Sequence, residues 1–126
     1  MVEARAIARY VRCSPRKLRL VVDLIRGKSA AEALAVLRLS PKRAARSVEK
    51  VLRSALANLS AKLDNISVDP AEVVITKAYV DPGPMFKRIL PAPMGRAYWI
   101  RRRTGHVTLV VQTQREEVES ATAGRR

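Results

Sequence analysis

Apolar residues recur at helical spacing in three successive stretches of the first half of the chain. In the first stretch they fall at positions i, i+3, i+4 and i+7, the spacing that buries one face of a helix. These four residues are Leu18, Val21, Val22 and Ile25. Ser14 and Pro15 supply a side-chain cap and a proline suited to the first helical position. The pattern therefore predicts a helix that starts at Pro15 and ends near Gly27, a residue type common at helix C-termini.

Two further helices are predicted directly after the first. Ser29 and Glu32 have the spacing of a capping box and predict a short second helix. Its inner face consists of Ala30, Ala33, Leu34 and Leu37. Ser40 and Pro41 repeat the Ser–Pro start signal and predict a third helix of about 22 residues, or roughly 33 Å. One face of this helix is apolar throughout: Ala44 or Ala45, Val48, Val51, Leu52, Ala55, Leu59 and Leu63.

Three segments have the alternation or the β-branched content of strands, namely residues 4–12, 73–80 and 106–112. In the first of them one side would carry Ala4, Ala6, Ala8 and Tyr10, although these alanines would equally tolerate a helix. The pairs Asp64–Asn65 and Asp69–Pro70 predict turns between the third helix and the second strand. Because strands joined by a ribbon pair antiparallel, we expect an α+β fold in which three helices pack on a small antiparallel sheet.

Residues 82–105 lack any core-forming periodicity. Prolines and glycines exclude a regular helix through the middle of the segment: Pro82, Gly83, Pro84, Pro91, Pro93 and Gly95. No acidic residue occurs between residues 82 and 115, whereas bases alternate with Phe86, Tyr98 and Trp99. A segment of about 24 residues is long for a loop in a compact domain, so it indicates either disorder or function. As a ribbon with about 12 residues per strand it would reach roughly 40 Å.

The chain length of 126 residues favours a single domain. Within it we expect a globular body formed by residues 1–81 and 106–114. Residues 82–105 are expected to protrude as a long β-hairpin, and residues 115–126 to form a frayed tail.

The net charge of the chain indicates a polyanionic partner. Lys and Arg number 25 against 11 Asp and Glu, which gives a formal net charge of +14. Such a charge repels itself and is compensated by nucleic acid or by an anionic membrane. No apolar run approaches the roughly 18 residues of a membrane span, and the charged N-terminus does not resemble a signal peptide. We therefore expect a cytoplasmic protein without a membrane partner, in keeping with its single cysteine.

The residue types that catalysis and metal binding require are scarce. One histidine, His106, and one cysteine, Cys13, cannot assemble a four-ligand zinc site. No glycine-rich phosphate loop occurs, and the acidic residues show no paired spacing. We expect neither an enzyme, nor a cofactor, nor a metal site. His106 is expected at a phosphate or a strand edge, and Cys13 in the core.

The first predicted helix begins with a cluster of cations, Arg16, Lys17 and Arg19. Cations at this end oppose the helix dipole and cost up to about 1 kcal/mol each unless an external anion compensates them. The start of the third predicted helix is also basic, with Lys42, Arg43 and Arg46. Both helix starts are therefore candidates for contact with a polyanion.

Three stretches carry a resemblance to a known family. They are ARYVRCSPRKLRLVVDLIRGKSAAEAL, the SALAN of the third helix, and AYVDPGPMFKRILPAPMGRAYWIRRRTGHVTLVV. Together they resemble the bacterial-type large-subunit ribosomal protein twenty-two family, over residues 4–111. The most specific pieces are SPRK followed by DLIRGK, and the DPGP, KR, GRA and RTGH positions of the hairpin.

The resemblance implies a structural constituent of the large ribosomal subunit that binds its RNA and supports assembly. Its partners would be large-subunit ribosomal RNA, neighbouring ribosomal proteins and, at the hairpin tip, the nascent polypeptide in the exit tunnel. The positions expected to bind RNA are Arg16, Lys17, Arg19, Lys42, Arg43, Arg46, Lys87, Arg88, Arg96, Arg101, Arg102, Arg103 and His106. The tip expected to line the tunnel comprises Lys87, Arg88, Ile89, Leu90, Pro91, Ala92, Pro93, Met94, Gly95 and Arg96.

The chain departs from the family pattern at three places in the hairpin. Residues 92–94 are Ala, Pro and Met where relatives usually carry more bases, Tyr98 and Trp99 follow the GRA motif in place of an acid, and Gly105 stands where a serine is usual. These changes favour a tip that stacks and packs on RNA as well as neutralising it. An alternative of another class is an architectural DNA-binding protein that uses a proline-tipped basic β-ribbon.

Overall fold

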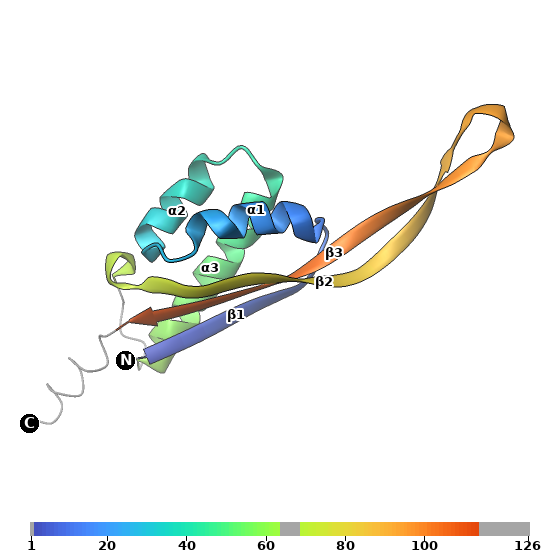
Figure 1. The fold of residues 1–126 in the computed structure, drawn as a ribbon. Coiled ribbons are helices and arrows are strands. Elements are labelled where there is room, and N and C mark those ends of the chain that lie inside the picture. Colours follow the sequence, from blue (N-terminus) through green and yellow to red (C-terminus); the bar gives the residue numbers. More distant parts are fainter. Residues whose placement is uncertain (1, 64–68, 114–126) are drawn as a thin grey trace, which may run out of the picture.

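The computed structural model describes residues 2–63 and 69–113. Within them, three α-helices pack on one three-stranded antiparallel sheet, and two strands continue far beyond the body as a ribbon (Figure 1). This arrangement confirms the predicted α+β fold with its protruding hairpin. The elements are β1 (Val2–Val11), α1 (Pro15–Ile25), α2 (Ala30–Leu39), α3 (Arg43–Lys62), η1 (Pro70–Glu72), β2 (Val74–Pro91), η2 (Pro93–Gly95) and β3 (Ala97–Thr113).

The turn predictions fall on both sides of a gap in the described residues. The turn at Asp69–Pro70 is confirmed, because the Asp69 carboxylate accepts a hydrogen bond from the Ala71 N–H at 3.0 Å and caps η1. The predictions for residues 64–65 and for the tail 115–126 lie outside the described residues. None of the described helices is long and apolar enough to cross a membrane.

The helix starts follow the capping residues in two cases out of three. Ser14 Oγ accepts from the backbone N–H of Lys17 at 3.5 Å and begins α1. Ser29 Oγ accepts from the backbone N–H of Glu32 at 3.3 Å and begins α2. Local sequence therefore determines where these two helices begin.

The predicted start of the third helix at Pro41 is wrong by two residues. Ser40 Oγ accepts from the backbone N–H of Lys42 at 3.3 Å, so it closes a short turn across Pro41 instead of capping the helix. The first helical residue is Arg43, and Lys42 takes the cap position without a side-chain hydrogen bond. The first turn of α3 therefore has no side-chain cap.

The core lies between the helices and one face of the sheet. Every residue predicted for the apolar faces of α1 and α3 is buried, and Ala44 and Ala45 are both included. In α2 the prediction holds for Ala30, Ala33 and Leu37, whereas Leu34 is only partly buried. The sheet contributes alternate residues, among them Ile75 and Leu109, because side chains alternate between the two faces of a strand.

The sheet has the order β1–β3–β2, with β3 in the centre. The segments predicted as strands at residues 73–80 and 106–112 prove to be parts of much longer strands of 18 and 17 residues. These strands stay paired from Val74, opposite Gln112, out to Pro91, opposite Ala97. The prolines do not interrupt β2 because it is an edge strand.

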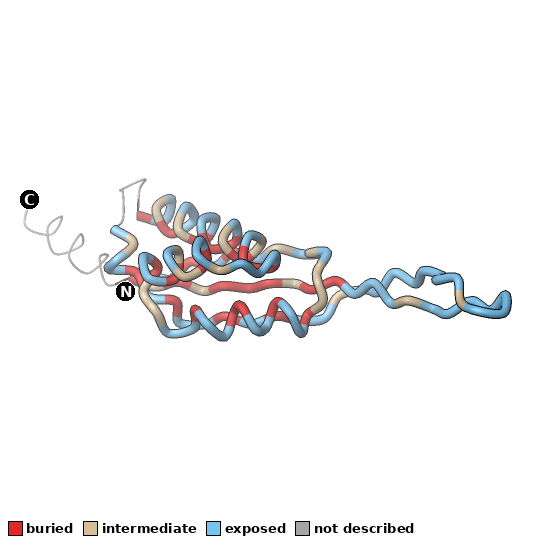
Figure 2. The backbone as a smooth tube through the Cα atoms, turned by 90° about the horizontal axis from the view of Figure 1, so that it is seen from above, coloured by how far each residue is buried: buried red, intermediate tan, exposed pale blue. Residues whose placement is uncertain are grey.

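The part of the hairpin outside the body, residues 82–103, is called the arm here. Figure 2 shows that buried residues end where the arm begins. No arm residue is buried, whereas the next two residues of β3, Thr104 and Gly105, are. The missing core periodicity of this segment therefore has a simple cause, since none of the described elements buries either face of the ribbon.

Two β-bulges flank β3 where the arm leaves the body. In β1 the register shifts between Ala8 and Val11, and in β2 it shifts between Pro82 and Met85. The first bulge gives Tyr10 a φ of 58° and leaves it 63% exposed, so the prediction that it shares the alanine side is wrong. Because bulges increase twist and bend a strand, this region, called the neck, sets the direction of the arm.

Two glycines allow close packing in the neck. A Cβ atom at Gly83 would lie 2.5 Å from Thr104 Oγ1, which donates a hydrogen bond of 2.7 Å to the carbonyl of Pro84. A Cβ atom at Gly105 would lie 2.8 Å from Leu18 Cδ1. The absence of a side chain at Gly105 therefore lets α1 pack against β3 at this point.

Candidate nucleic-acid interface

A cleft of about 990 Å³ lies at the base of the arm. Its walls come from the segment before α1, the first turns of α1 and α3, and the nearest part of β2 and β3. Basic residues dominate its lining and no acidic residue contributes to it: Arg12, Lys17, Lys42, Arg43, Arg88, Arg101, Arg102 and Arg103. None of these cations forms an ion pair with a described residue. A cavity lined in this way strongly attracts a polyanion.

The N-termini of two helices meet at this cleft. Neither α1 nor α3 has an acidic residue in its first turn, and the cap residue Lys42 offers no side-chain acceptor. Helix N-termini carry unpaired N–H groups and a partial positive charge, so they bind phosphate oxygens well. By contrast α2, which does not line the cleft, has Glu32 in its first turn. α1 and α3 therefore lack the acidic first-turn residue that α2 has.

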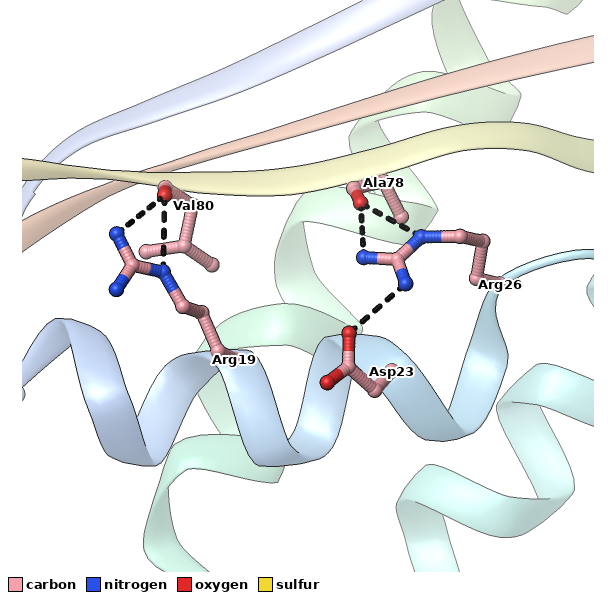
Figure 3. A network of polar contacts seen from close by, with 5 residues as sticks. All are labelled: Arg19, Asp23, Arg26, Ala78 and Val80. Carbon is pink, nitrogen blue, oxygen red and sulfur yellow. Dashed lines mark hydrogen bonds and ion pairs between the residues drawn. The ribbon is translucent and has the colours of Figure 1, made fainter.

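Arg19 and Arg26 point from α1 to the outer edge of β2 (Figure 3). The Arg19 guanidinium donates to the carbonyl of Val80 through Nε at 3.4 Å and Nη2 at 3.2 Å. Arg26 donates to the carbonyl of Ala78 at 3.0 and 2.7 Å, and its Nη1 lies 2.9 Å from Asp23 Oδ1. The sequence led to the prediction that Arg19 binds RNA. In the fold its guanidinium is hydrogen-bonded to the edge strand β2.

One pair of bases lies in opposite positions of the two strands of the arm. Lys87 lies directly opposite Arg101, and Arg102 lies opposite Phe86. Like charges in opposite positions of a β-ladder destabilise it unless an anion lies between or above them. The guanidinium of Arg88 stacks over the Phe86 ring at 5.6 Å. The arm thus combines uncompensated charge with an aromatic surface.

Apolar side chains cover both faces of the arm near its end. Ile89 pairs with Trp99 on one face and Leu90 with Tyr98 on the other, and each of the four is at least 50% exposed. A ribbon of two strands with no covering layer is only marginally stable in water. This end of the arm is therefore suited to a partner that covers both faces.

The turn at the end of the arm is closed by its own backbone. The Ala92 N–H donates to the Arg96 carbonyl at 2.8 Å, and both Met94 and Gly95 have positive φ. Methionine is rare in this conformation, whereas glycine adopts it readily. Met94 is 93% exposed, so the strained residue presents its side chain fully to the surroundings.

His106 lies in the neck and makes contacts within the protein. Its Nδ1 accepts a hydrogen bond from the Tyr10 N–H at 3.0 Å, and the two rings meet edge to face at 5.0 Å. Because Nδ1 is an acceptor here, a proton of the neutral ring sits on Nε2. His106 therefore stabilises the bulge of β1.

The predicted RNA-binding residues occupy different positions in the structure. Those that line the cleft are Lys17, Lys42, Arg43, Arg88, Arg101, Arg102 and Arg103. Those exposed elsewhere are Arg16 and Arg46 on the body and Lys87 and Arg96 on the arm. Prediction from the sequence missed Arg12, which lines the cleft two residues before the cap of α1. Its place beside a basic helix start was the available signal.

Metal binding and thiol chemistry would depend on the His, Cys, Asp and Glu side chains of the described residues. No group of three or more His, Cys, Asp or Glu side chains there is arranged to hold a metal ion. Cys13 is half-buried between the core and the cleft, and its backbone N–H donates to the Val11 carbonyl at 2.8 Å. Its position fits a small packing residue.

Comparison with known proteins identifies the family. Residues 6–112 match the family model described as ribosomal protein L22p/L17e. The chain is 53% identical over 115 residues to the large ribosomal subunit protein uL22 of Pelotomaculum thermopropionicum, covering 91% of this chain and 99% of that protein. It is 51% identical, with the same coverage of both chains, to the uL22 proteins of Desulforamulus reducens and Solibacter usitatus. The chain therefore belongs to the L22p/L17e family of ribosomal proteins.

Proposed function

We propose that the chain binds large-subunit ribosomal RNA through the basic cleft and the arm, and that the end of the arm lines the nascent-peptide exit tunnel. Family membership makes the chain a constituent of the large ribosomal subunit in the cytoplasm, with ribosomal RNA and other ribosomal proteins as partners. Its role there is structural. The family match does not support the alternative of an architectural DNA-binding protein.

The observation that carries this proposal is the uncompensated charge of the cleft. Its bases lack acidic partners among the described residues, and two helix N-termini open into it. Phosphate contacts dominate the affinity of such proteins, and A-form RNA is recognised mainly by shape. The cleft is therefore suited to hold folded RNA by its backbone.

The arm supports the same partner in a different way. It has too little apolar contact of its own to be stable in water, so RNA that surrounds it would supply the missing contacts. Insertion of the arm would then be coupled to the folding of the RNA, which links binding to subunit assembly. At the far end, Met94 would meet the nascent chain.

Salt titration tests the role of the cleft. Binding of the chain to large-subunit RNA should weaken steeply with salt, because each neutralised phosphate releases counterions. Arg43→Gln and Arg102→Gln should each reduce the slope of log affinity against log salt by about one. Arg38→Gln is the matched control, because Arg38 lies outside the cleft and already contacts Glu49 at 3.5 Å. A flat titration of the unchanged chain would contradict RNA binding through phosphates.

Shortening the arm tests the tunnel proposal. Deleting Ile89, Leu90, Tyr98 and Trp99 removes two cross-strand pairs, which preserves the register and withdraws the turn by about 7 Å. The variant should still enter large subunits through the body and cleft, whereas the tunnel should widen and the response to a macrolide should change. If the variant failed to enter subunits, the separation of anchoring from tunnel lining would be wrong.

A further inference from the structure

The two outer edges of the sheet, along β2 and along β1, differ in how far their backbone groups are hydrogen-bonded. Along β2, the carbonyl of Val80 accepts from Arg19 of α1, and the carbonyl of Ala78 accepts from Arg26, the residue that follows α1. Further along, Ile75 exchanges two backbone hydrogen bonds of 3.0 Å with Gly27 and Lys28 of the loop between α1 and α2. The body part of the β2 edge is therefore closed to any further strand, as edge strands in stable proteins commonly are.

Backbone alternation shows which groups of β1 face outward. Leu109 of β3 lies opposite Ala78 of β2 and opposite Ala6 of β1. Because the Ala78 carbonyl points away from β3, the polar backbone groups of Leu109 point to β1 and pair with Ala6. Alternation along β1 then turns the N–H and C=O groups of Arg5 and Ile7 to the open edge of the sheet.

Side chains spaced four residues apart on α3 donate to carbonyls spaced two residues apart along the first part of this edge. Lys62 Nζ donates to the carbonyl of Glu3 at 2.7 Å, and Asn58 Nδ2 donates to the carbonyl of Arg5 at 2.9 Å. Four residues of a helix rise about 6 Å and two residues of a strand about 6.7 Å, so the two series stay nearly in step. The next member of the helical series is Ser54.

The series of caps stops at Ser54, which would lie opposite Ile7. A serine side chain is much shorter than that of asparagine or lysine, and no hydrogen bond from another described residue reaches the outward N–H or C=O of Ile7. A groove of about 390 Å³ occupies this place, between the Ile7–Val11 part of β1 and the Ser47–Ser54 part of α3. The edge is therefore open between the last cap and the bulge.

The walls of the groove define the chemistry of an occupant. Ala8, Val11 and Val51 supply apolar surface, and the free backbone groups of Ile7 require one acceptor and one donor side by side. A polypeptide strand offers that pair in register. Lys50 and Arg12 also line the groove and have no acidic partner among the described residues.

We propose that this groove, between the open edge of β1 and α3, binds an extended acidic segment of a neighbouring protein, which adds to the sheet as a fourth strand. A second copy of this chain does not fit, because two such edges would bring Arg5 and Arg9 of both copies together. RNA fits less well than a peptide, because the Ile7 carbonyl would repel a phosphate bound at the adjacent N–H.

Zero-length cross-linking in purified large subunits tests the proposal. A carbodiimide joins an amine to a carboxylate in direct contact, so it should couple Lys50 to an Asp or Glu within one segment of a neighbouring protein, identified by mass spectrometry. Hydrogen exchange at the Ile7 amide should also be at least about tenfold slower in the subunit than in the isolated chain. Absence of a Lys50 link to another protein, or ultraviolet cross-links from the groove to RNA instead, would overturn the proposal.

A variant that continues the series of caps provides the decisive comparison. Ser54→Asn places an amide one turn from Asn58, within reach of the Ile7 carbonyl, and should reduce the Lys50 cross-link about tenfold. Ala57→Asn is the matched control, because it adds the same group at an exposed position of α3 outside the groove. Both variants should enter subunits normally, which separates this proposal from RNA binding. An unchanged cross-link in Ser54→Asn would show that the groove is not the docking site.

Discussion

The body and the arm of this protein differ in how far their apolar side chains are buried and their charges are compensated. In the body, a continuous apolar core is buried, and even surface arginines such as Arg19 and Arg26 have backbone acceptors. In the arm, no residue is buried, like charges face one another, and large apolar side chains are exposed on both faces. The fold of the body is thus held together by its own buried contacts, whereas the arm has few such contacts.

The largest expected difference between body and arm is in the free energy of unfolding, when one large apolar side chain of each is truncated. Leu59→Ala should lower the free energy of unfolding by about 2–5 kcal/mol, because it leaves a cavity at a fully buried position of α3. Trp99→Ala should change it by less than about 0.5 kcal/mol, because Trp99 is 67% exposed. Denaturant unfolding measures both values. The same Trp99 variant should weaken RNA binding by about 1–3 kcal/mol through lost stacking.

A smaller effect is expected from two glycines, one in the neck and one in the turn of the arm. Gly83→Ala should destabilise the protein by about 1–3 kcal/mol, because its Cβ atom would collide with the buried Thr104 hydroxyl. Gly95→Ala meets no atom within 4 Å and strains only the turn, so thermal unfolding of the body should not change. Equal losses in both variants would mean that arm and body unfold as one unit.

The smallest expected effect is on the free energy of unfolding when one of two arginines, Arg19 or Arg101, is replaced. Arg19→Met should lower the free energy of unfolding by about 1 kcal/mol, since it removes the donors to the Val80 carbonyl, and should leave the salt dependence of RNA binding unchanged. Arg101→Met should have the reverse effects, because Arg101 lines the cleft without an acidic partner. Calorimetry and salt titration of the two variants measure both properties.

Much of the body could be predicted from the sequence, because its helices must bury an apolar face against a core. Leu18 to Ile25 and Val48 to Leu59 show this as a regular spacing, and Ser14 and Ser29 mark the helix starts. The start of α3 could not be predicted as well, because Ser40 Oγ accepts from the N–H of Lys42, which precedes the helix, and not from an N–H of its first turn.

The roles of individual bases were harder to predict, because a side chain of this length can reach targets on elements that only the fold brings near. Arg19 lies in the first part of α1 together with Lys17, yet one contacts β2 and the other lines the cleft. The protruding hairpin was predicted correctly, but the pairing of individual residues along it was not, because without burial there is no alternation in the sequence to fix the register. The family resemblance supplied the hairpin frame, but no side-chain contacts.

A small change of angle at the two bulges of the neck is amplified along the length of the arm. About ten residues of β2 beyond Asp81 extend roughly 33 Å, so a rotation of only 10° at the neck would displace the turn by about 6 Å. Distances of that order separate successive nucleotides along an RNA strand. A substitution at Gly83 or Gly105 that rotated the neck by this angle would move Met94 by about the spacing of one nucleotide without altering any residue of the turn.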